Sequence, residues 1–152
     1  TFLKLSPDIS KQNLENICKL VMKNKFLNGL ILTNTTIKRD DLYKKPVKNS
    51  WKLKEEGGLS GTPLREKTNK IIRSVYELTN GKITIIGVGG ISTGRDAFEK
   101  ISKGASLLQL YTSLIYRGPN VVTTILSDLS YSLKRKGIKN VTDLVGENIN
   151  YD

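Results

Sequence analysis

Short apolar runs alternate with amphipathic segments along this chain. The apolar runs have the length and composition of buried β-strands, and they fall at 2–5, 30–32, 83–86 and 105–110. The amphipathic segments place their apolar side chains on one face of a helix, and they fall at 11–23, 63–79, 94–103 and 119–136. A short segment at 141–145 predicts a further turn or two of helix. The pattern therefore predicts strands and helices in alternation.

Residues that favour helix ends stand at the boundaries of these segments. Ser10 is the predicted N-cap of the first helix, Pro63 opens the second, and Asn80-Gly81 closes it. Each strand is apolar along its length, which is typical of parallel strands buried on both faces. Four βα units result, whereas a complete eight-unit barrel needs roughly 200 to 250 residues. The chain is therefore predicted to be either an open four-stranded α/β sheet or about half of a barrel.

Composition narrows the chemistry. The 152 residues amount to about one domain, and 38% hydrophobic residues are enough to bury a core. The absence of histidine excludes His-based acid–base catalysis, triads and zinc sites, and the single Cys18 is expected to be an inert core residue. No apolar run reaches the roughly 18 residues of a membrane span. Because the chain starts at Thr1 without a signal-like leader, we expect it to be part of a longer protein.

Positive charge is in clear excess, with 25 Lys and Arg against 14 Asp and Glu and a formal net charge of +11. No nucleic-acid-binding motif accompanies it, so a solvated basic surface is the favoured interpretation and an anionic partner the alternative. The segment 38–56 is basic, lacks periodicity, and is longer than the roughly 12 to 15 residues usual for a structureless loop. We predict that it is a mobile insert over the ligand-binding mouth, ordered only near 57–61.

Two successive βα junctions offer places for a phosphate. The turn Gly87-Val88-Gly89-Gly90 follows a predicted strand and precedes a helix, so its amide groups and the helix N-terminus could cradle an anion. It is not the dinucleotide fingerprint, because the position of the third glycine is Ser92. Tyr111-Thr112 follows the next strand, and barrels bind phosphate at the loops after their last two strands. A plain tight turn is the alternative for the glycines.

Polar residues at two other strands are candidates for ligand contacts. Thr33-Asn34-Thr35-Thr36 places hydroxyl and amide groups at a strand end, where they can read the edges of a planar heterocycle. A polar turn with a helix cap is the alternative. Lys4 interrupts an apolar strand, so its ammonium group must either snorkel to solvent or meet an anion.

Six motifs, taken in order, resemble the C-terminal half of dihydroorotate dehydrogenase. They are Leu3-Lys4-Leu5-Ser6-Pro7-Asp8, Thr33-Asn34-Thr35-Thr36, Gly57-Gly58-Leu59-Ser60-Gly61, Ile85-Ile86-Gly87-Val88-Gly89-Gly90, Gly104-Ala105-Ser106 and Gln109-Leu110-Tyr111-Thr112. The last of these, with Gly118-Pro119, resembles class 2, the quinone-reducing and membrane-associated type. The resemblance implies an α/β fold, the C-terminal half of an FMN-binding (β/α)8 TIM barrel over 1–152. It also implies oxidation of (S)-dihydroorotate to orotate in pyrimidine synthesis.

The resemblance also assigns ligand contacts. The matched flavin contacts are Lys4, Thr33, Gly61, Gly90, Tyr111 and Thr112. The matched orotate contacts are Asn34 and Thr35. Lys4 would supply positive charge near the pyrimidine edge of the flavin, which favours the reduced, anionic ring. Gly90 with Tyr111-Thr112 would hold the phosphate.

Other parts of the family have no counterpart in this chain. The serine that serves as catalytic base in class 2, the first four strands and the N-terminal quinone-binding helices are absent, so we expect these residues to be inactive alone. The resemblance implies quinone binding and membrane association through that absent region, at the mitochondrial inner membrane or a bacterial cytoplasmic membrane. Another FMN barrel, such as class 1 dihydroorotate dehydrogenase or dihydropyrimidine dehydrogenase, is one alternative. A basic module binding nucleic acid or phosphorylated metabolites, without catalysis, is the other.

Overall fold

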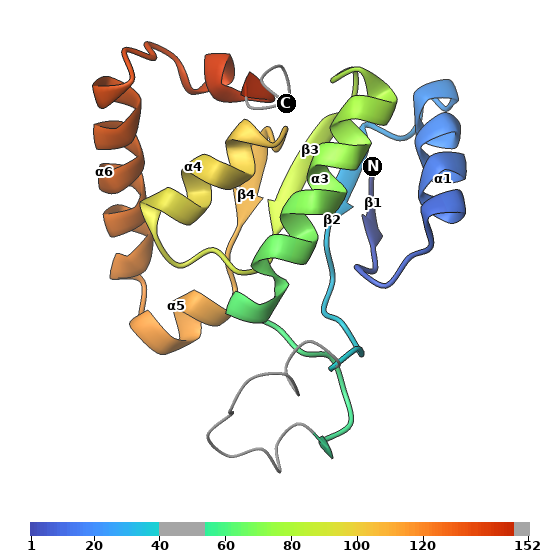
Figure 1. Ribbon diagram of the computed structural model, residues 1–152, viewed down its shortest axis with the longest axis horizontal. Helices are drawn as coiled ribbons and strands as arrows, with labels where there is room; N and C mark the ends of the chain where they lie inside the picture. The colour runs from blue at the N-terminus through green and yellow to red at the C-terminus, as the bar shows by residue number, and fades with distance from the viewer. Residues whose placement is uncertain (40–53, 148–152) are drawn as a thin grey trace.

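A computed structural model describes residues 1–39 and 54–147 (Figure 1). Its strands are β1 (Phe2–Leu5), β2 (Gly29–Leu32), β3 (Thr84–Val88) and β4 (Leu107–Gln109). Its α-helices are α1 (Lys11–Lys23), α3 (Arg65–Thr79), α4 (Gly94–Ser102), α5 (Thr112–Arg117) and α6 (Asn120–Arg135). Two 3-10 helices complete the described part, η2 (Thr62–Leu64) and η3 (Val141–Leu144). The predicted alternation of strands and helices is confirmed.

The four strands form one parallel sheet in the order β1-β2-β3-β4. The predicted parallel pairing of neighbours is therefore confirmed. The register pairs Lys4 with Ile31 and Leu32 with Gly87, so the ends of the first three strands are level. The carboxyl ends of all four strands consequently meet at one edge of the sheet, where α/β folds bind ligands.

Helices cover one face of this sheet. Figure 1 shows α3 and α4 lying across that face, with α1 beside β1 and α6 outside α4. The main core joins alternate strand residues to α1 and α3, and it includes the fully buried Leu30, Leu32, Ile72, Val75 and Ile85. Ile31, Ile86 and Val88, which alternate with these residues, are only half buried. Burial of both sheet faces was expected. Within the described residues, helices bury one face, and the side chains on the other face are only half buried.

The helical segments differ from the sequence-based expectation in three respects. The segment from Pro63 starts as η2 and becomes α-helical only at Arg65, and the turn at 141–145 is a 3-10 helix. The helix α5 was not predicted, because its six residues bury no side chain and so show no apolar period. Residues 40–53 lie outside the described ranges, so the mobility of the insert at 38–56 stays a prediction.

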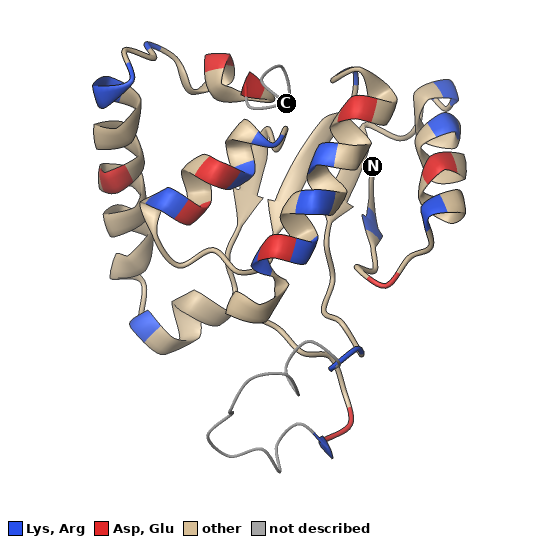
Figure 2. Ribbon diagram, in the orientation of Figure 1, with Lys and Arg blue, Asp and Glu red and all other residues tan. Residues whose placement is uncertain are grey.

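Charged side chains are spread over the helices. Figure 2 shows Lys and Arg on α1, α3, α4 and α6, interleaved with Asp and Glu. A nucleic-acid footprint would gather basic residues in one stripe. Over the described helices this interleaving is what a solvated basic surface predicts, and the choice between such a surface and an anionic partner stays a prediction.

One lysine is buried inside the fold. Lys100 has no exposed surface, and its Nζ donates to Asn69 Oδ1 at 2.6 Å. Burial lowers the pKa of Lys100 to about 8, although Glu99 and Asp96 act in the opposite direction. The stem of Lys100 also fills the space beside Gly87, where a Cβ would lie 2.7 Å from its Cδ. The lysine therefore packs against the back of β3 at an electrostatic cost.

We expect Lys100→Met to change how stability depends on pH. The pKa of Lys100 is about 8 in the folded chain and 10.5 in the unfolded chain, so between these values the unfolded chain binds more protons. Wild-type stability should therefore gain roughly 2 kcal/mol relative to the Met variant as the pH rises from 7 to 10. Urea unfolding at several pH values measures this difference. Lys70→Met, at an exposed position on α3, is the control and should follow the wild type; parallel curves for Lys100→Met would contradict the prediction.

Candidate functional site

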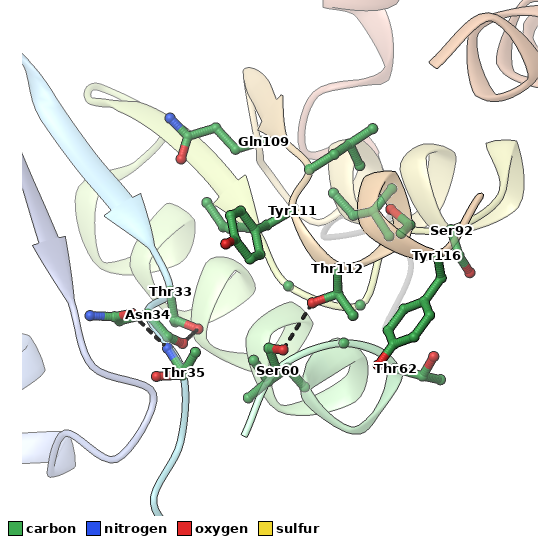
Figure 3. Close-up of a pocket in the computed structure, with 18 of the residues that line it drawn as sticks. Thr33, Asn34, Thr35, Ser60, Thr62, Ser92, Gln109, Tyr111, Thr112 and Tyr116 are labelled. Atoms are coloured by element: carbon green, nitrogen blue, oxygen red, sulfur yellow. Dashed lines mark hydrogen bonds between the residues drawn. The ribbon is translucent and has the colours of Figure 1, made fainter. Parts of the chain in front are cut away.

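A cavity of about 630 Å³ lies at the carboxyl edge of the sheet (Figure 3). Residues that follow each of the strands β2, β3 and β4 line it, together with Lys4 of β1 and residues within 60–64, which lead directly into α3. All eight residues assigned from the resemblance line this one cavity: Lys4, Thr33, Asn34, Thr35, Gly61, Gly90, Tyr111 and Thr112. Residues separated by more than a hundred positions therefore meet at the predicted place.

The turn after β2 is held by hydrogen bonds to both neighbouring strands. Thr33 N donates to Val88 O at 3.2 Å, and Asn34 N donates to Leu5 O at 2.8 Å. The Asn34 side chain accepts a bond from Thr35 N at 2.9 Å through Oδ1. Its NH2 group is therefore left to donate to a ligand.

The loops after β3 and β4 form the other end of the cavity. Gly89 and Gly90 have φ angles of +106° and +72°, a conformation that favours glycine. A Cβ on Gly90 would lie 2.5 Å from Arg65 Cβ, so this turn packs directly on the start of α3. Ser60 Oγ and Thr112 Oγ1 lie 2.9 Å apart across the cavity wall (Figure 3). The segment before α3 and the loop after β4 are thereby tied together.

The N-terminus of α4 already holds an anion, which is the carboxylate of Asp96. Its Oδ2 accepts from the backbone N–H groups of Ser92 and Thr93 at 3.0 and 2.9 Å, and Oδ1 lies 2.6 Å from Arg65 Nη1. Burial alone would raise the pKa of Asp96, but the hydrogen bonds from Arg65, Ser92 and Thr93 lower it further than burial raises it. Asp96 therefore occupies the amides of Ser92 and Thr93 at this helix end, and a phosphate site at the turn before α4 stays a prediction. The remaining candidates are the amides of Gly90 and of Tyr111-Thr112.

Among the described residues, two cationic side chains line the cavity, Lys4 and Arg117. Arg117 Nη1 donates to Ser92 O, which places the guanidinium near the loop after β3. Figure 3 shows Ser92 and Tyr116 on the side of the cavity opposite Asn34 and Thr35. Sequence reasoning missed Arg117 because it lies on α5; the only available signal was its place shortly after the Tyr111-Thr112 motif.

The donor set of the cavity fits a flavin mononucleotide. Neutral hydroxyl and amide groups predominate, as recognition of the N–H and C=O edges of a flavin requires. One cation stands near the Thr33–Thr36 turn and the other near the glycine loop, where a phosphate would need positive charge. An elongated ligand that is polar at one end and phosphorylated at the other matches this arrangement.

A family model described as dihydroorotate dehydrogenase matches residues 1–133. The chain belongs to the dihydroorotate dehydrogenase family. This confirms the resemblance carried by the six motifs. Within residues 1–39 and 54–147, no helix combines the length and apolar character needed to cross a bilayer.

Relatives of known name are similar over nearly the whole chain. "Dihydroorotate dehydrogenase (quinone), mitochondrial" of Mus musculus is 47% identical over 145 residues, which are 95% of this chain and 35% of the mouse protein. "Dihydroorotate dehydrogenase (quinone)" of Rippkaea orientalis is 45% identical, over 97% of this chain and 39% of that protein. The solved structure of ligand-free dihydroorotate dehydrogenase from Eimeria tenella superposes with a TM-score of 0.88 at 40% identity, over 97% of this chain and 39% of that one. The chain therefore spans little more than a third of these relatives.

Proposed function

We propose that the native protein carrying this chain oxidises dihydroorotate to orotate, with FMN as cofactor and a quinone as electron acceptor, in pyrimidine synthesis. The single observation that supports this most is the convergence of all eight assigned residues on one cavity. The quinone acceptor is supported by the names of the mouse and Rippkaea relatives, both of the quinone type. Those names favour it over the class 1 alternative.

FMN would lie along the cavity. When bound, it would accept the electrons removed from dihydroorotate. We assign its phosphate to the amides of Gly90, Tyr111 and Thr112, and its pyrimidine edge to Lys4. Thr33 and Gly61 would border the ring system between these ends. In this arrangement the chain would bind the flavin and orient its ring system.

The substrate would pair with the turn after β2. The NH2 group of Asn34 donates to a carbonyl or carboxylate oxygen of dihydroorotate, because its Oδ1 is engaged by Thr35 N. The hydroxyl group of Thr35 either donates or accepts, so it matches the adjacent group of the ring. These contacts orient the substrate and carry no proton from it.

We also propose that these 152 residues do not catalyse the reaction alone. The barrel-facing residues Ile31, Ile86 and Val88 are half buried, and the edge strands leave Phe2 37% and Leu107 56% exposed. In a closed barrel the first and last strands pair, so the sheet has no edges. Its interior is packed with side chains from all eight strands, so residues facing it are buried. The proton acceptor would come from the rest of the barrel.

Membrane association is a further part of the proposal. We assign it to a region beyond this chain, at the mitochondrial inner membrane in a eukaryote or the cytoplasmic membrane in a bacterium. The mitochondrial designation of the mouse relative supports the first setting. Quinones partition into the bilayer, so an enzyme that reduces them must reach its surface.

Purification of the native protein tests this function. We expect a yellow protein whose flavin absorbance bleaches with dihydroorotate and returns on adding a ubiquinone analogue, with soluble acceptors such as fumarate ineffective.

Asn34→Ala should keep the flavin and lose orotate binding, measured by perturbation of the flavin spectrum. A colourless protein, or one whose flavin dihydroorotate cannot reduce, would contradict the proposal. The 152 residues expressed alone should show no turnover.

A further inference from the structure

Asp8 is not one of the assigned flavin or substrate contacts, yet it lies beside the turn after β2, where we place the substrate. It follows β1, and its side chain is only 13% exposed. Its Oδ1 lies 2.5 Å from Lys67 Nζ of α3 and accepts from Thr36 Oγ1 at 2.7 Å. Its Oδ2 accepts from Ile37 N at 3.0 Å. One carboxylate therefore joins the loop after β1, the turn after β2 and the first turn of α3.

The contacts of Asp8 are made in its ionised form. Burial alone would raise the pKa of this carboxyl, but the hydrogen bonds from Lys67, Thr36 and Ile37 lower it below its usual value. Charge-assisted hydrogen bonds of this kind are about twice as strong as neutral ones. Removing the carboxylate would leave the partly buried Lys67 ammonium without its ion-pair partner.

Thr36 also makes hydrogen bonds to residues other than Asp8. Its Oγ1 accepts from Lys38 N at 3.1 Å, and its backbone pairs with Leu59 through two hydrogen bonds of 3.1 and 2.8 Å. Arg39 spans the same two segments, donating to Thr36 O and Gly57 O. Thr36 is thus the point where the turn after β2 is fastened to the segment that leads into α3.

The other end of the turn is fastened separately. Thr33 Oγ1 donates to Asn34 O at 3.0 Å and lies 3.2 Å from Thr68 Oγ1. Asn34 and Thr35 therefore stand between two anchors, one at Thr33 and one at the Asp8–Thr36 contact. Gly58 packs closely against Thr35, because a Cβ added to Gly58 would lie 1.9 Å from Thr35 Oγ1.

We propose that Asp8 is a positioning residue for the substrate, which holds Thr36 and thereby presents Asn34 and Thr35 to dihydroorotate. The inference rests on the proposed function. Binding a ligand to a loosened turn has to order that turn first, so loss of the Asp8 anchor lowers affinity. The flavin contacts at Gly90 and Tyr111-Thr112 belong to other loops and keep their geometry. The substrate and cofactor affinities should consequently separate.

Asp8→Asn in the native holoprotein tests this. We expect the Kd for orotate and the KM for dihydroorotate to rise about tenfold, while kcat changes less than threefold and FMN content stays at the wild-type level. Lys67→Met should raise the orotate Kd only two- to threefold, because Thr36 and Ile37 still bind Asp8. Glu77→Gln is the control. It removes a carboxylate from an ion pair with Arg73 on the same helix, and it should change neither the orotate Kd nor the FMN content.

A second pair of variants keeps the test decisive if Asp8→Asn fails to fold. Thr36→Val removes the hydroxyl that contacts Asp8 and should weaken orotate binding, whereas Thr36→Ser keeps it and should restore wild-type affinity. An orotate Kd within twofold of the wild type in both Asp8→Asn and Thr36→Val would overturn the inference, as would a parallel loss of FMN and orotate. A wild-type holoprotein that binds FMN but not orotate would remove the proposed function itself, a result distinct from failure of the variants.

Discussion

Lys4→Ala in the native protein is expected to weaken FMN binding at least tenfold and to lower the reduction potential of the bound flavin. Lys4 lines the cavity beside the turn after β2, where we place the pyrimidine edge of the ring. Reduction adds negative charge to that edge, so a nearby ammonium group stabilises the reduced form more than the oxidised form. Loss of the ammonium group therefore destabilises the reduced flavin more than the oxidised flavin, which lowers the reduction potential.

The size of the shift depends on how far water screens the charge. Two unit charges about 4 Å apart interact by roughly 4 kcal/mol at an effective dielectric of 20. Lys4 is an exposed side chain in the described chain, so we expect only part of this. A decrease of about 30 mV, equal to roughly 1.4 kcal/mol for a two-electron couple, is the smallest effect we anticipate. Equilibrium titration against a reference dye measures the potential, and apoprotein reconstitution measures the affinity.

Arg117 provides the matched control for Lys4. Arg117 is the second cation that lines the cavity within residues 1–39 and 54–147, but it donates to Ser92 O, and Ser92 lies on the side of the cavity away from Asn34 and Thr35 (Figure 3). Arg117→Ala should weaken FMN binding by loss of charge near the phosphate and leave the potential unchanged, since screening removes its effect on the distant ring. If Lys4→Ala keeps its flavin with an unaltered potential, Lys4 is a solvent-facing lysine at the rim of the cavity.

Local pattern predicted most of the fold. Within the described residues, the alternation of apolar runs with amphipathic segments located the four strands and four of the five α-helices. Strands expected to be buried on both faces are apolar along their length, and helices buried on one face repeat their apolar residues about every 3.6 positions. The helix α5 escaped detection because it buries no side chain. The four strands could be ordered from the sequence because parallel βα units place consecutive strands side by side.

Most residues of the candidate site were predictable because they follow strands, whereas Lys4 was singled out by its place inside an apolar strand and Gly61 by the family resemblance. Asn34, Gly90 and Thr112 could be grouped because the ends of parallel strands meet at one edge. The contacts that hold the site were not predicted. Asp8 and Lys67 are 59 positions apart, and no periodicity relates them. The Thr93–Asp96 capping box was readable in the sequence, and recognising it would have shown that a carboxylate occupies amides at the start of α4.

The Gly90 turn carries the second large expected effect. Gly90→Ala should lower the free energy of unfolding by about 3 kcal/mol and abolish FMN retention. An L-residue at a φ near +70° costs roughly 1 to 2 kcal/mol, and overpacking adds about as much again. The new methyl would lie 2.6 Å from Arg65 Cα and 2.7 Å from Arg65 N. Relief would require the start of α3 to move, and Arg65 is tied to Asp96 across the same loop.

Gly137→Ala separates the steric part of this effect from the conformational part. Gly137 ends α6 with a φ of +71°, close to the +72° of Gly90, but a Cβ there would meet nothing within 4 Å. Its substitution should cost only the conformational part, roughly 1 to 2 kcal/mol, and leave FMN bound. Chemical unfolding of the two variants, with flavin absorbance read before denaturation, makes the comparison. Equal losses of stability, with FMN kept in both, would mean that the loop after β3 can retreat from α3 and that its close packing does not shape the phosphate end of the cavity.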